Sequence, residues 1–393
     1  MSPRRRVTPP QVEPLWPAPA RVRVNRSTGP GQTGYLVVPS LKRPRLLVPL
    51  AVPGATQMLR RHGGNRAQRT ARSIWRVLHR SPFTARLPIT RLTVTPEPAG
   101  IEAYLAARLS GSVQIGVLLG PPRANAKPVL QVFDESGATV AFAKMGSTAL
   151  TAALVDNEAA ALALLGRSAP STFSAPALLS HGRWRGTPVL VQAALSLSQS
   201  DLAPVTPPVP VMAEIATLSG MSEQRLEGSA FLAASDPGPQ TSWQEVDLQP
   251  FRRLYAALGS AGSCDFGSCH GDFGPWNMAT DGAVVEVWDW ERFAAAVPVG
   301  FDAAHYRTQE AFVRSVEPGA AWTSMVEDVS TLLTTLGLDP DRASVAAGCY
   351  LLAICARYRS DAADAPTPTL RRRMRWLSAT AAVAVQSLDG AYA

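Results

Sequence analysis

A short segment in the second half of the chain holds polar residues whose types and spacing suit phosphoryl transfer. His270, Asp272 and Asn277 lie in the sequence His-Gly-Asp-Phe-Gly-Pro-Trp-Asn, and Asp289 follows an apolar stretch. Phosphoryl transfer needs a group that orients the attacking hydroxyl, and oxygen ligands for Mg²⁺, which offsets the charge on the phosphates. We interpret Asp272 as the catalytic group that accepts the hydroxyl proton. Asn277 and Asp289 are interpreted as the metal ligands.

The spacing of the polar residues in this segment favours one kind of phosphoryl-transfer site. Asp272 and Asn277 are five residues apart, as in the D-x-x-x-x-N catalytic loop of protein kinases. A tight turn between two strands would explain the glycines of the segment, but not Asn277 and Asp289 together. A single histidine is a poor metal site, so His270 is assigned to bracing the loop.

A second pair of charged residues lies upstream. Lys144 ends the strand-like sequence Val-Ala-Phe-Ala-Lys and is one of only three lysines in the chain. Glu158 lies on the Ala/Leu-rich helix that is expected next. A buried lysine without a charged partner would be costly, which favours a pair between these residues. Such a pair holds the nucleotide phosphates in kinase-like folds. The alternative is an edge strand with a solvated lysine.

Together these motifs resemble the aminoglycoside phosphotransferase and choline-kinase-like family. Residues 270–277 read H-G-D-x-x-P-x-N and residues 288–291 read W-D-W-E. The resemblance implies a protein-kinase-like fold, ATP and Mg²⁺ as cofactors, and a small-molecule hydroxyl as the acceptor. It also implies that Gln192 and Ala194 belong to the hinge that binds adenine. Asp302 would support the catalytic loop as a structural acid.

The apolar pattern predicts an α+β fold with two lobes, and the resemblance implies that ATP binds between them. The small β-rich N-lobe covers residues 97–195, and the larger helical C-lobe, with the catalytic loop and the acceptor site, covers residues 196–393. Five strands and one helix are expected in the N-lobe, over residues 113–119, 129–133, 139–144, 149–165 (the helix), 177–180 and 187–192. The expected C-lobe helices cover residues 211–226, 248–258, 302–315, 321–336, 342–359 and 369–387.

The first 96 residues form a basic N-terminal extension. They carry 18 Lys and Arg against one acid, whereas the rest of the chain carries 20 against 29. Residues 1–30 are rich in Pro and Arg and are expected to be disordered. Residues 34–79 predict two strands and a basic helix. Docking of that helix on the protein is favoured over binding to nucleic acid or an anionic membrane, because no known nucleic-acid motif accompanies the charge.

The composition also argues against secreted and membrane-spanning proteins. Four cysteines are too few for a disulfide scaffold, the charge-free stretches are short or broken by Pro, and the basic N-terminus lacks an apolar signal core. We therefore expect a cytoplasmic protein with no transmembrane segment.

The acceptor stays open at this stage. It could be an aminoglycoside, an amino sugar, a sugar or an amino alcohol. The net charge of −9 over residues 97–393 would suit a cationic acceptor. Acids on the C-terminal helices could shape its site: Glu310, Glu317, Glu327 and Asp328. The alternatives are a catalytically inactive nucleotide-binding module, or an adaptor that acts through the basic extension. Oligomeric state cannot be assigned.

Overall fold

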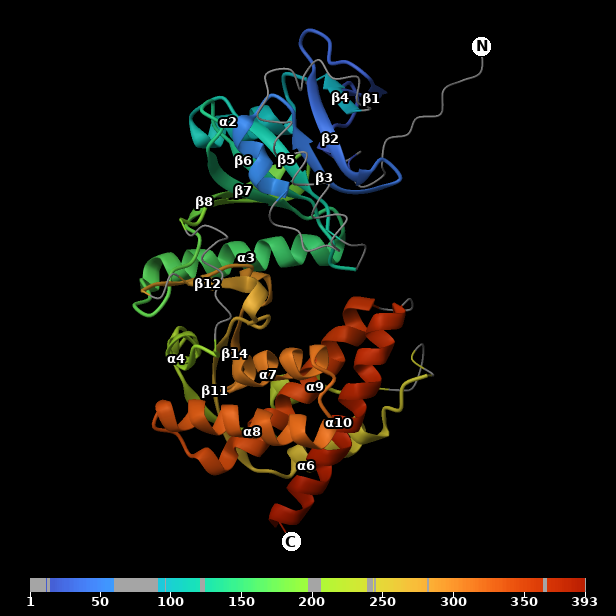
Figure 1. The fold of residues 1–393 in the computed structure, drawn as a ribbon. Helices are drawn as coiled ribbons and strands as arrows, with labels where there is room; N and C mark the ends of the chain where they lie inside the picture. The colour runs from blue at the N-terminus through green and yellow to red at the C-terminus, as the bar shows by residue number, and fades with distance from the viewer. Residues whose placement is uncertain are drawn as a thin grey trace. The chain divides into compact units, whose positions relative to one another are not determined.

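The computed structural model describes residues 12, 15–59, 91–95, 97–120, 124–196, 206–238, 243, 245–280, 283–362 and 366–392. The chain divides into two compact units (Figure 1). The first unit comprises Met1–Ala160 and Pro176–Gln199. The second comprises Ala161–Ala175 and Ser200–Ala393. Each unit is described by itself.

An antiparallel sheet of nine strands forms the described part of the first unit. Its strand order is β1-β4-β2-β3-β5-β6-β7-β9-β8. The strands are β1 (Arg21–Asn25), β2 (Thr33–Ser40), β3 (Arg43–Pro49), β4 (Arg91–Thr95), β5 (Gln114–Leu118), β6 (Val129–Phe133), β7 (Thr139–Met145), β8 (Leu178–Trp184) and β9 (Thr187–Ala193). The strands expected over residues 113–192 are thus confirmed.

Side chains along the strands alternate between the two faces of this sheet, and each face has its own hydrophobic core. Ile115 and Val117 of β5 are fully buried with Leu130 and Val132 of β6 in the larger cluster. The opposite face packs Leu46 and its neighbours against the 3₁₀ helix η2 (Pro53–Leu59). Apolar residues spaced by two therefore point to one face of the sheet, as strand geometry requires.

The first 96 residues are not separate from this sheet where the structure describes them. Strand β3 pairs with β5, with Leu46 opposite Leu118 and Leu47 opposite Val117. The two expected strands are confirmed as β2 and β3, but the boundary expected near residue 96 is not a boundary between compact units. The basic helix expected up to residue 79 lies outside the described residues.

The expectation of disorder over residues 1–30 is wrong for its described part. Arg21–Asn25 form β1, which pairs with β4 in antiparallel register. Its two valines alternate with arginines, and Val22 packs against the larger core cluster while Arg21 and Arg23 are exposed. Trp16 is buried and donates a hydrogen bond to Glu102 at 3.0 Å. The high Pro and Arg content hid this short alternating strand.

Two helices accompany the sheet. Helix α2 (Ile101–Leu109) was not expected from the sequence, and it buries Ile101 and Leu105, one turn apart. Helix α3 (Ala149–Ser168) matches the helix expected after β7. Among the described residues, α3 alone is long and apolar enough to span a membrane. It also carries the fully buried Glu158, paired with the sheet, as a core helix would.

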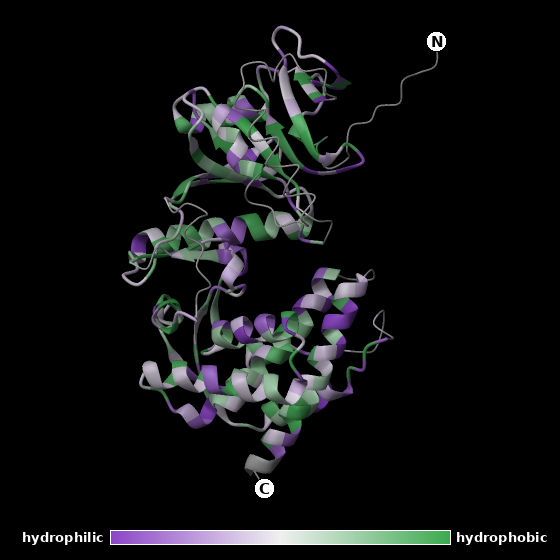
Figure 2. Ribbon diagram, in the orientation of Figure 1, coloured by the Kyte–Doolittle hydropathy of each residue, from purple (hydrophilic) through white to green (hydrophobic). Residues whose placement is uncertain are grey.

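Helices dominate the second unit. They are α4 (Val209–Thr217), α5 (Ala230–Ala234), α6 (Gln249–Gly259), α7 (Phe301–Val313), α8 (Pro318–Thr335), α9 (Ala343–Ala362) and α10 (Pro368–Tyr392). Hydrophobic and hydrophilic segments alternate along α8 and α10 (Figure 2). Five of the six expected helices are confirmed within a few residues. The sixth, expected over residues 211–226, ends earlier, and its last residues form strand β10 (Ser222–Arg225).

Two small sheets in the second unit carry the loops that matter for chemistry. Strand β11 (Ser263–Cys269) lies between β10 and β14 (Ala294–Pro298). Strands β12 (Met278–Thr280) and β13 (Val285–Val287) form a hairpin. The architecture is therefore α+β, with an antiparallel sheet in the first unit and a mainly helical second unit, as expected.

Candidate active site

The first unit holds the expected lysine–glutamate pair. Lys144 Nζ lies 2.6 Å and 2.8 Å from the two carboxylate oxygens of Glu158. The side chains are 7% and 0% exposed. Strand β7 lies inside the sheet, with Lys144 between Val129 and Leu190, so the lysine is not on an edge strand. The alternative of a solvated lysine is thereby excluded, and the pair predicted from the sequence is confirmed.

The residues assigned to the hinge lie at the end of β9. Gln192 is buried opposite Phe142, and its amide oxygen has no hydrogen-bond partner among the described residues. The backbone N–H of Ala194 donates to Val140 O at 3.2 Å. Because that donor is already used, Ala194 can offer a base only its carbonyl oxygen.

The loop after β11 is held by side chains that bind its backbone. Asp302 accepts hydrogen bonds from the N–H groups of His270 and Gly271, at 2.7 Å and 2.9 Å. Arg357 donates to the carbonyl oxygen of Gly271 at 2.6 Å. Gly271 has a φ of +82°, and a Cβ there would lie 2.2 Å from Arg292 O, so this position requires glycine. The role of Asp302 in supporting the loop fits the sequence prediction.

His270 connects this loop to the segment after β13. Its Nδ1 accepts the backbone N–H of Asp272 at 3.2 Å, and its Nε2 lies 3.0 Å from Trp288 O. A carbonyl oxygen only accepts, so the ring must carry its proton on Nε2. Burial lowers the pKa of His270 to about 4, which keeps the ring neutral. The ring also packs against Trp290, with centroids 4.5 Å apart. These contacts support the bracing role predicted for His270.

Asp272 is held by a second histidine that sequence reasoning missed. His305 Nε2 lies 3.1 Å from Asp272 Oδ1, and Tyr350 O–H lies 3.2 Å from His305 Nδ1. Burial is the largest single effect and acts to raise the pKa of Asp272, but the hydrogen bond from His305 and the electrostatic interactions with His305 and His270 together outweigh it, so the pKa lies below its ordinary value. Asp272 is therefore ionised at neutral pH. Its side chain is 36% exposed, so a hydroxyl can reach it.

A signal for His305 was present in the sequence. Asp302 and His305 are three residues apart on α7, and residues at that spacing share one helix face. Once Asp302 is assigned to the catalytic loop, the same face carries His305 toward it. Tyr350 gave no such signal, because it lies on α9 and depends on helix packing.

The β12–β13 hairpin brings the two expected metal ligands to one end of the site. Met278 pairs with Val287, and Trp288 N–H donates to Asn277 O at 3.0 Å, so Asn277 lies next to the segment that carries Asp289. The amide nitrogen of Asn277 donates to Asp272 Oδ2 at 3.1 Å, which leaves the amide oxygen as its ligand atom.

The electrostatics of this end of the site fit a divalent cation. Asp289 has a left-handed backbone, with φ 71° and ψ 50°, a conformation often found at functional sites. Its charge acts to raise the pKa of Asp272, so the two carboxylates repel each other. A carboxylate and an amide oxygen are hard donors that suit Mg²⁺, which would relieve this repulsion.

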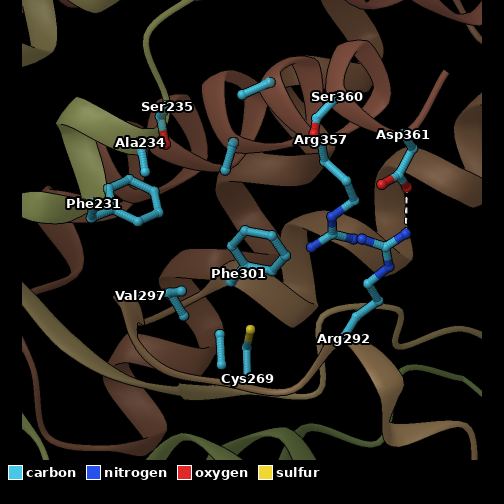
Figure 3. A pocket seen from close by; sticks show the side chains of 13 residues that line it. Phe231, Ala234, Ser235, Cys269, Arg292, Val297, Phe301, Arg357, Ser360 and Asp361 are labelled. Atoms are coloured by element: carbon cyan, nitrogen blue, oxygen red, sulfur yellow. Dashed lines mark hydrogen bonds and ion pairs between the residues drawn. The ribbon is translucent and has the colours of Figure 1, made fainter. Parts of the chain in front are cut away.

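A cavity of about 360 Å³ opens in the second unit (Figure 3), and Cys269, which immediately precedes the loop of His270 and Asp272, is one of its lining residues. It is lined by residues from α5, the end of β11, β14, the start of α7 and the second half of α9. One of its lining residues, Arg357, donates to Gly271 O as described above. Figure 3 also shows the ion pair between Arg292 and Asp361 across one side of the cavity.

The structure thus assembles the predicted residues in two groups. His270, Asp272, Asn277, Asp289 and Asp302 come together in the second unit. The first unit contributes the lysine–glutamate pair and the end of β9.

Comparisons with known proteins were made for the whole chain. No protein-family model matches it, and no curated protein matches it. Among solved structures, a thermostable mutant of aminoglycoside phosphotransferase APH(4)-Ia, in a ternary complex with ADP and hygromycin B, is similar with a TM-score of 0.49. The two sequences are 16% identical, and the similarity covers 73% of this chain and 98% of that chain.

Two further structures are similar at lower scores. A putative fructosamine-3-kinase from Haemophilus somnus has a TM-score of 0.43 and 14% identity, covering 73% of this chain and 96% of that chain. Amicoumacin kinase hAmiN, in complex with AMP-PNP, Ca²⁺ and Ami, has a TM-score of 0.43 and 11% identity, covering 71% and 94%. Function does not follow from fold, so the activity must be argued from the site.

Proposed function

We propose that this chain is an ATP- and Mg²⁺-dependent kinase that phosphorylates a hydroxyl group of a small molecule. The observation that carries the proposal is the position of the Asp272 carboxylate. It is ionised, reachable from solvent, and fixed between His305 Nε2 and Asn277 Nδ2. A carboxylate held in this way can orient a hydroxyl and accept its proton.

The proposed reaction assigns a separate task to each group. Lys144, oriented by Glu158, would bind the α- and β-phosphates of the nucleotide. The acceptor oxygen forms a bond to the γ-phosphorus as the bond from that phosphorus to the bridging oxygen of ADP breaks. The hydroxyl proton passes to Asp272 and then to solvent. Asn277 and Asp289 would hold Mg²⁺, which supplies positive charge against the phosphate oxygens.

Residues at the end of β9 offer groups that would contact the base of the nucleotide. Gln192 has an unpartnered amide oxygen, and Ala194 keeps its carbonyl oxygen. Both groups accept hydrogen bonds, so they would suit the amino group of adenine.

A nucleotide-binding module without catalysis is the second candidate. The same lysine–glutamate pair and metal ligands would bind nucleotide in such a module. It would not need a solvent-reachable carboxylate held by two side-chain donors, which is why we favour the kinase.

The four cysteines are free and buried, in agreement with the cytoplasmic location that we propose.

Two measurements test the proposal. Saturating ATP with Mg²⁺ should raise the melting temperature, because a ligand that binds only the folded state stabilises it. A screen of sugars, amino sugars, aminoglycosides and amino alcohols should then find an acceptor that causes ATP consumption. Stabilisation by ATP without consumption with any acceptor would favour the inactive module. No stabilisation by ATP or GTP would contradict both candidates.

A further inference from the structure

The cavity described above lies next to the loop that carries Asp272. Arg357 donates to Gly271 O, and Gly271 immediately precedes Asp272. A molecule held in the cavity therefore lies against the loop that carries the proposed catalytic carboxylate. Its volume of about 360 Å³ is near the lower end of the range for small-molecule sites, roughly 300–1,000 Å³. A compact acceptor fits this size better than a large oligosaccharide.

The charges that line the cavity do not balance. Arg292 is paired with Asp361, and both line the cavity (Figure 3). Arg357 has no ion pair among the described residues, and its contacts there are Gly271 O and the ring of Phe301, 5.6 Å from the guanidinium carbon. The described lining therefore carries one net positive charge.

The remaining donors of Arg357 are available to a ligand. Only one of its nitrogens donates to the loop. The buried carboxylate of Asp302 feels the arginine charge, which acts to lower its pKa, but its oxygens accept the N–H groups of His270 and Gly271. A guanidinium group offers five N–H donors in a planar fork that matches carboxylate and phosphate oxygens.

The acids expected to attract a cationic acceptor lie elsewhere. Glu310 and Asp328 both form ion pairs with Arg307, at 2.9 Å and 2.7 Å. Glu317 and Glu327 are exposed. None of these four lines the cavity. The preference for a cationic acceptor that the net charge suggested therefore has no counterpart in this cavity.

We propose that the cavity binds an acidic group of the acceptor, a carboxylate or a phosphate, through Arg357. Phe231 and Phe301 present their rings to the same cavity and pack against the apolar part of the molecule (Figure 3). The inference rests on the proposed kinase function, because it identifies the class of acceptor. The acceptor is then a small hydroxyl compound with a negative charge.

A matched series of monosaccharides tests the charge preference. Glucose, glucosamine, glucuronate and glucose 6-phosphate share one ring and differ in charge. Binding of each to the full chain is measured by calorimetry without nucleotide, so the result does not depend on catalysis. Glucuronate or glucose 6-phosphate should bind at least tenfold more tightly than glucose, and the tighter of the two identifies the acidic group. Equal binding of the four, a preference for glucosamine, or no binding of either acidic sugar would overturn the inference.

Variants of Arg357 test the residue. Arg357→Gln should remove the preference for the acidic sugar over glucose, and Arg357→Lys should keep part of the preference. Arg253→Gln is the matched control, because Arg253 is exposed on α6 and does not line the cavity. Melting temperatures show whether each variant folds. A preference that survives in folded Arg357→Gln would also overturn the inference.

Failure of this inference can be told apart from failure of the kinase proposal. If ATP with Mg²⁺ stabilises the chain and ATP is consumed only with neutral or cationic acceptors, the kinase proposal stands and the proposal of an acidic acceptor is overturned. Absence of any nucleotide effect contradicts the kinase, whatever the sugars show.

Discussion

Asp272 is positioned by side chains from three segments of the chain. Asn277 lies five residues further along the same loop, His305 lies on α7, and Tyr350 on α9 orients His305. Burial lowers the pKa of His305, so the ring is neutral and donates from Nε2 while Nδ1 accepts the tyrosine proton. The carboxylate is therefore fixed by neutral donors and keeps its own charge.

Substitutions along this chain of contacts should separate chemistry from positioning. Asp272→Asn removes the proton acceptor and should reduce turnover about a hundredfold or more, with nucleotide binding almost unchanged. His305→Gln should reduce turnover by roughly tenfold to a hundredfold, the value of one hydrogen bond to a charged group. Tyr350→Phe should have a smaller effect. Steady-state kinetics and ATP binding are measured for each variant. Full activity in Asp272→Asn would show that the catalytic assignment is wrong.

Asp289→Ala makes the complementary change. It removes a proposed metal ligand but leaves the contacts of Asp272 with His305 and Asn277 in place. Nucleotide binding should then lose its dependence on Mg²⁺, which a titration of the metal at fixed ATP measures. A variant that still requires Mg²⁺ for tight binding would place the metal elsewhere.

His270 should make the stability of the second unit depend on pH. The unfolded chain binds a proton at this residue near pH 6.5, whereas the folded protein does so only near a pKa of about 4. The unfolded state thus binds more protons between these values, and stability falls as the pH falls. Asp302 acts in the opposite direction, because burial raises its pKa to about 6, but it is one group against the two buried histidines.

Urea unfolding at pH 7 and pH 5 measures this effect. Wild type should lose more stability than His270→Gln on acidification, with a difference of about 2 kcal/mol. His181→Gln serves as the control, because His181 lies near the surface of the first unit. An identical loss in wild type and His270→Gln would mean that His270 is not held neutral in the folded protein.

Helices and strands differ in how well their sequences predict them. Strands β5 to β7 are mostly apolar runs that turn residues separate, so their bounds and the position of Lys144 follow from the sequence. Strand β10 is exposed at all four residues and has no apolar signal. It forms only because it pairs with β11, a contact between segments about 40 residues apart. The apolar stretch before Asp289 indicated the strand that is β13, but its pairing with β12 was not predicted.

The ion pair of Lys144 on β7 with Glu158 on α3 allows a test of how these two elements are joined. Glu158→Gln leaves Lys144 buried without its charged partner and should destabilise the first unit by about 3–5 kcal/mol. Replacing both residues, with Lys144→Met and Glu158→Leu, removes both charges and should restore much of that stability. The double variant should nevertheless show no stabilisation by ATP with Mg²⁺. Thermal unfolding with and without nucleotide measures both effects. A nucleotide response in the double variant would remove the phosphate-binding role of Lys144.

At the scale of the whole molecule, uneven charge suggested a division that the sheet does not show. Of the basic side chains described in residues 1–96, Arg21, Arg23, Arg26, Lys42 and Arg43 are exposed and place charge on the surface of the first unit, whereas Arg91 on β4 is buried. Strands β2 and β3 of the same segment bury Tyr35 and Leu47 in the same core cluster as β5 to β7. Charged residues mark the face of a strand that points to solvent, whereas the alternate residues determine whether the strand packs into the core. The composition of residues 1–96 could therefore predict their surface but not their place in the sheet.

Removal of residues 1–96 tests this conclusion. Deletion takes away β1 to β4, leaves β5 as an open edge, and exposes Ile115 and Val117 on the face that those strands help to cover. Exposed apolar strands at a sheet edge promote aggregation, so the shortened chain should be insoluble or lose cooperative unfolding. Arg21→Gln with Arg23→Gln is the matched control, which removes charge but keeps the sheet, and it should melt near the wild-type temperature. A soluble chain from residue 97 onward that still responds to ATP with Mg²⁺ would show that the extension is dispensable, as a separate adaptor segment would be.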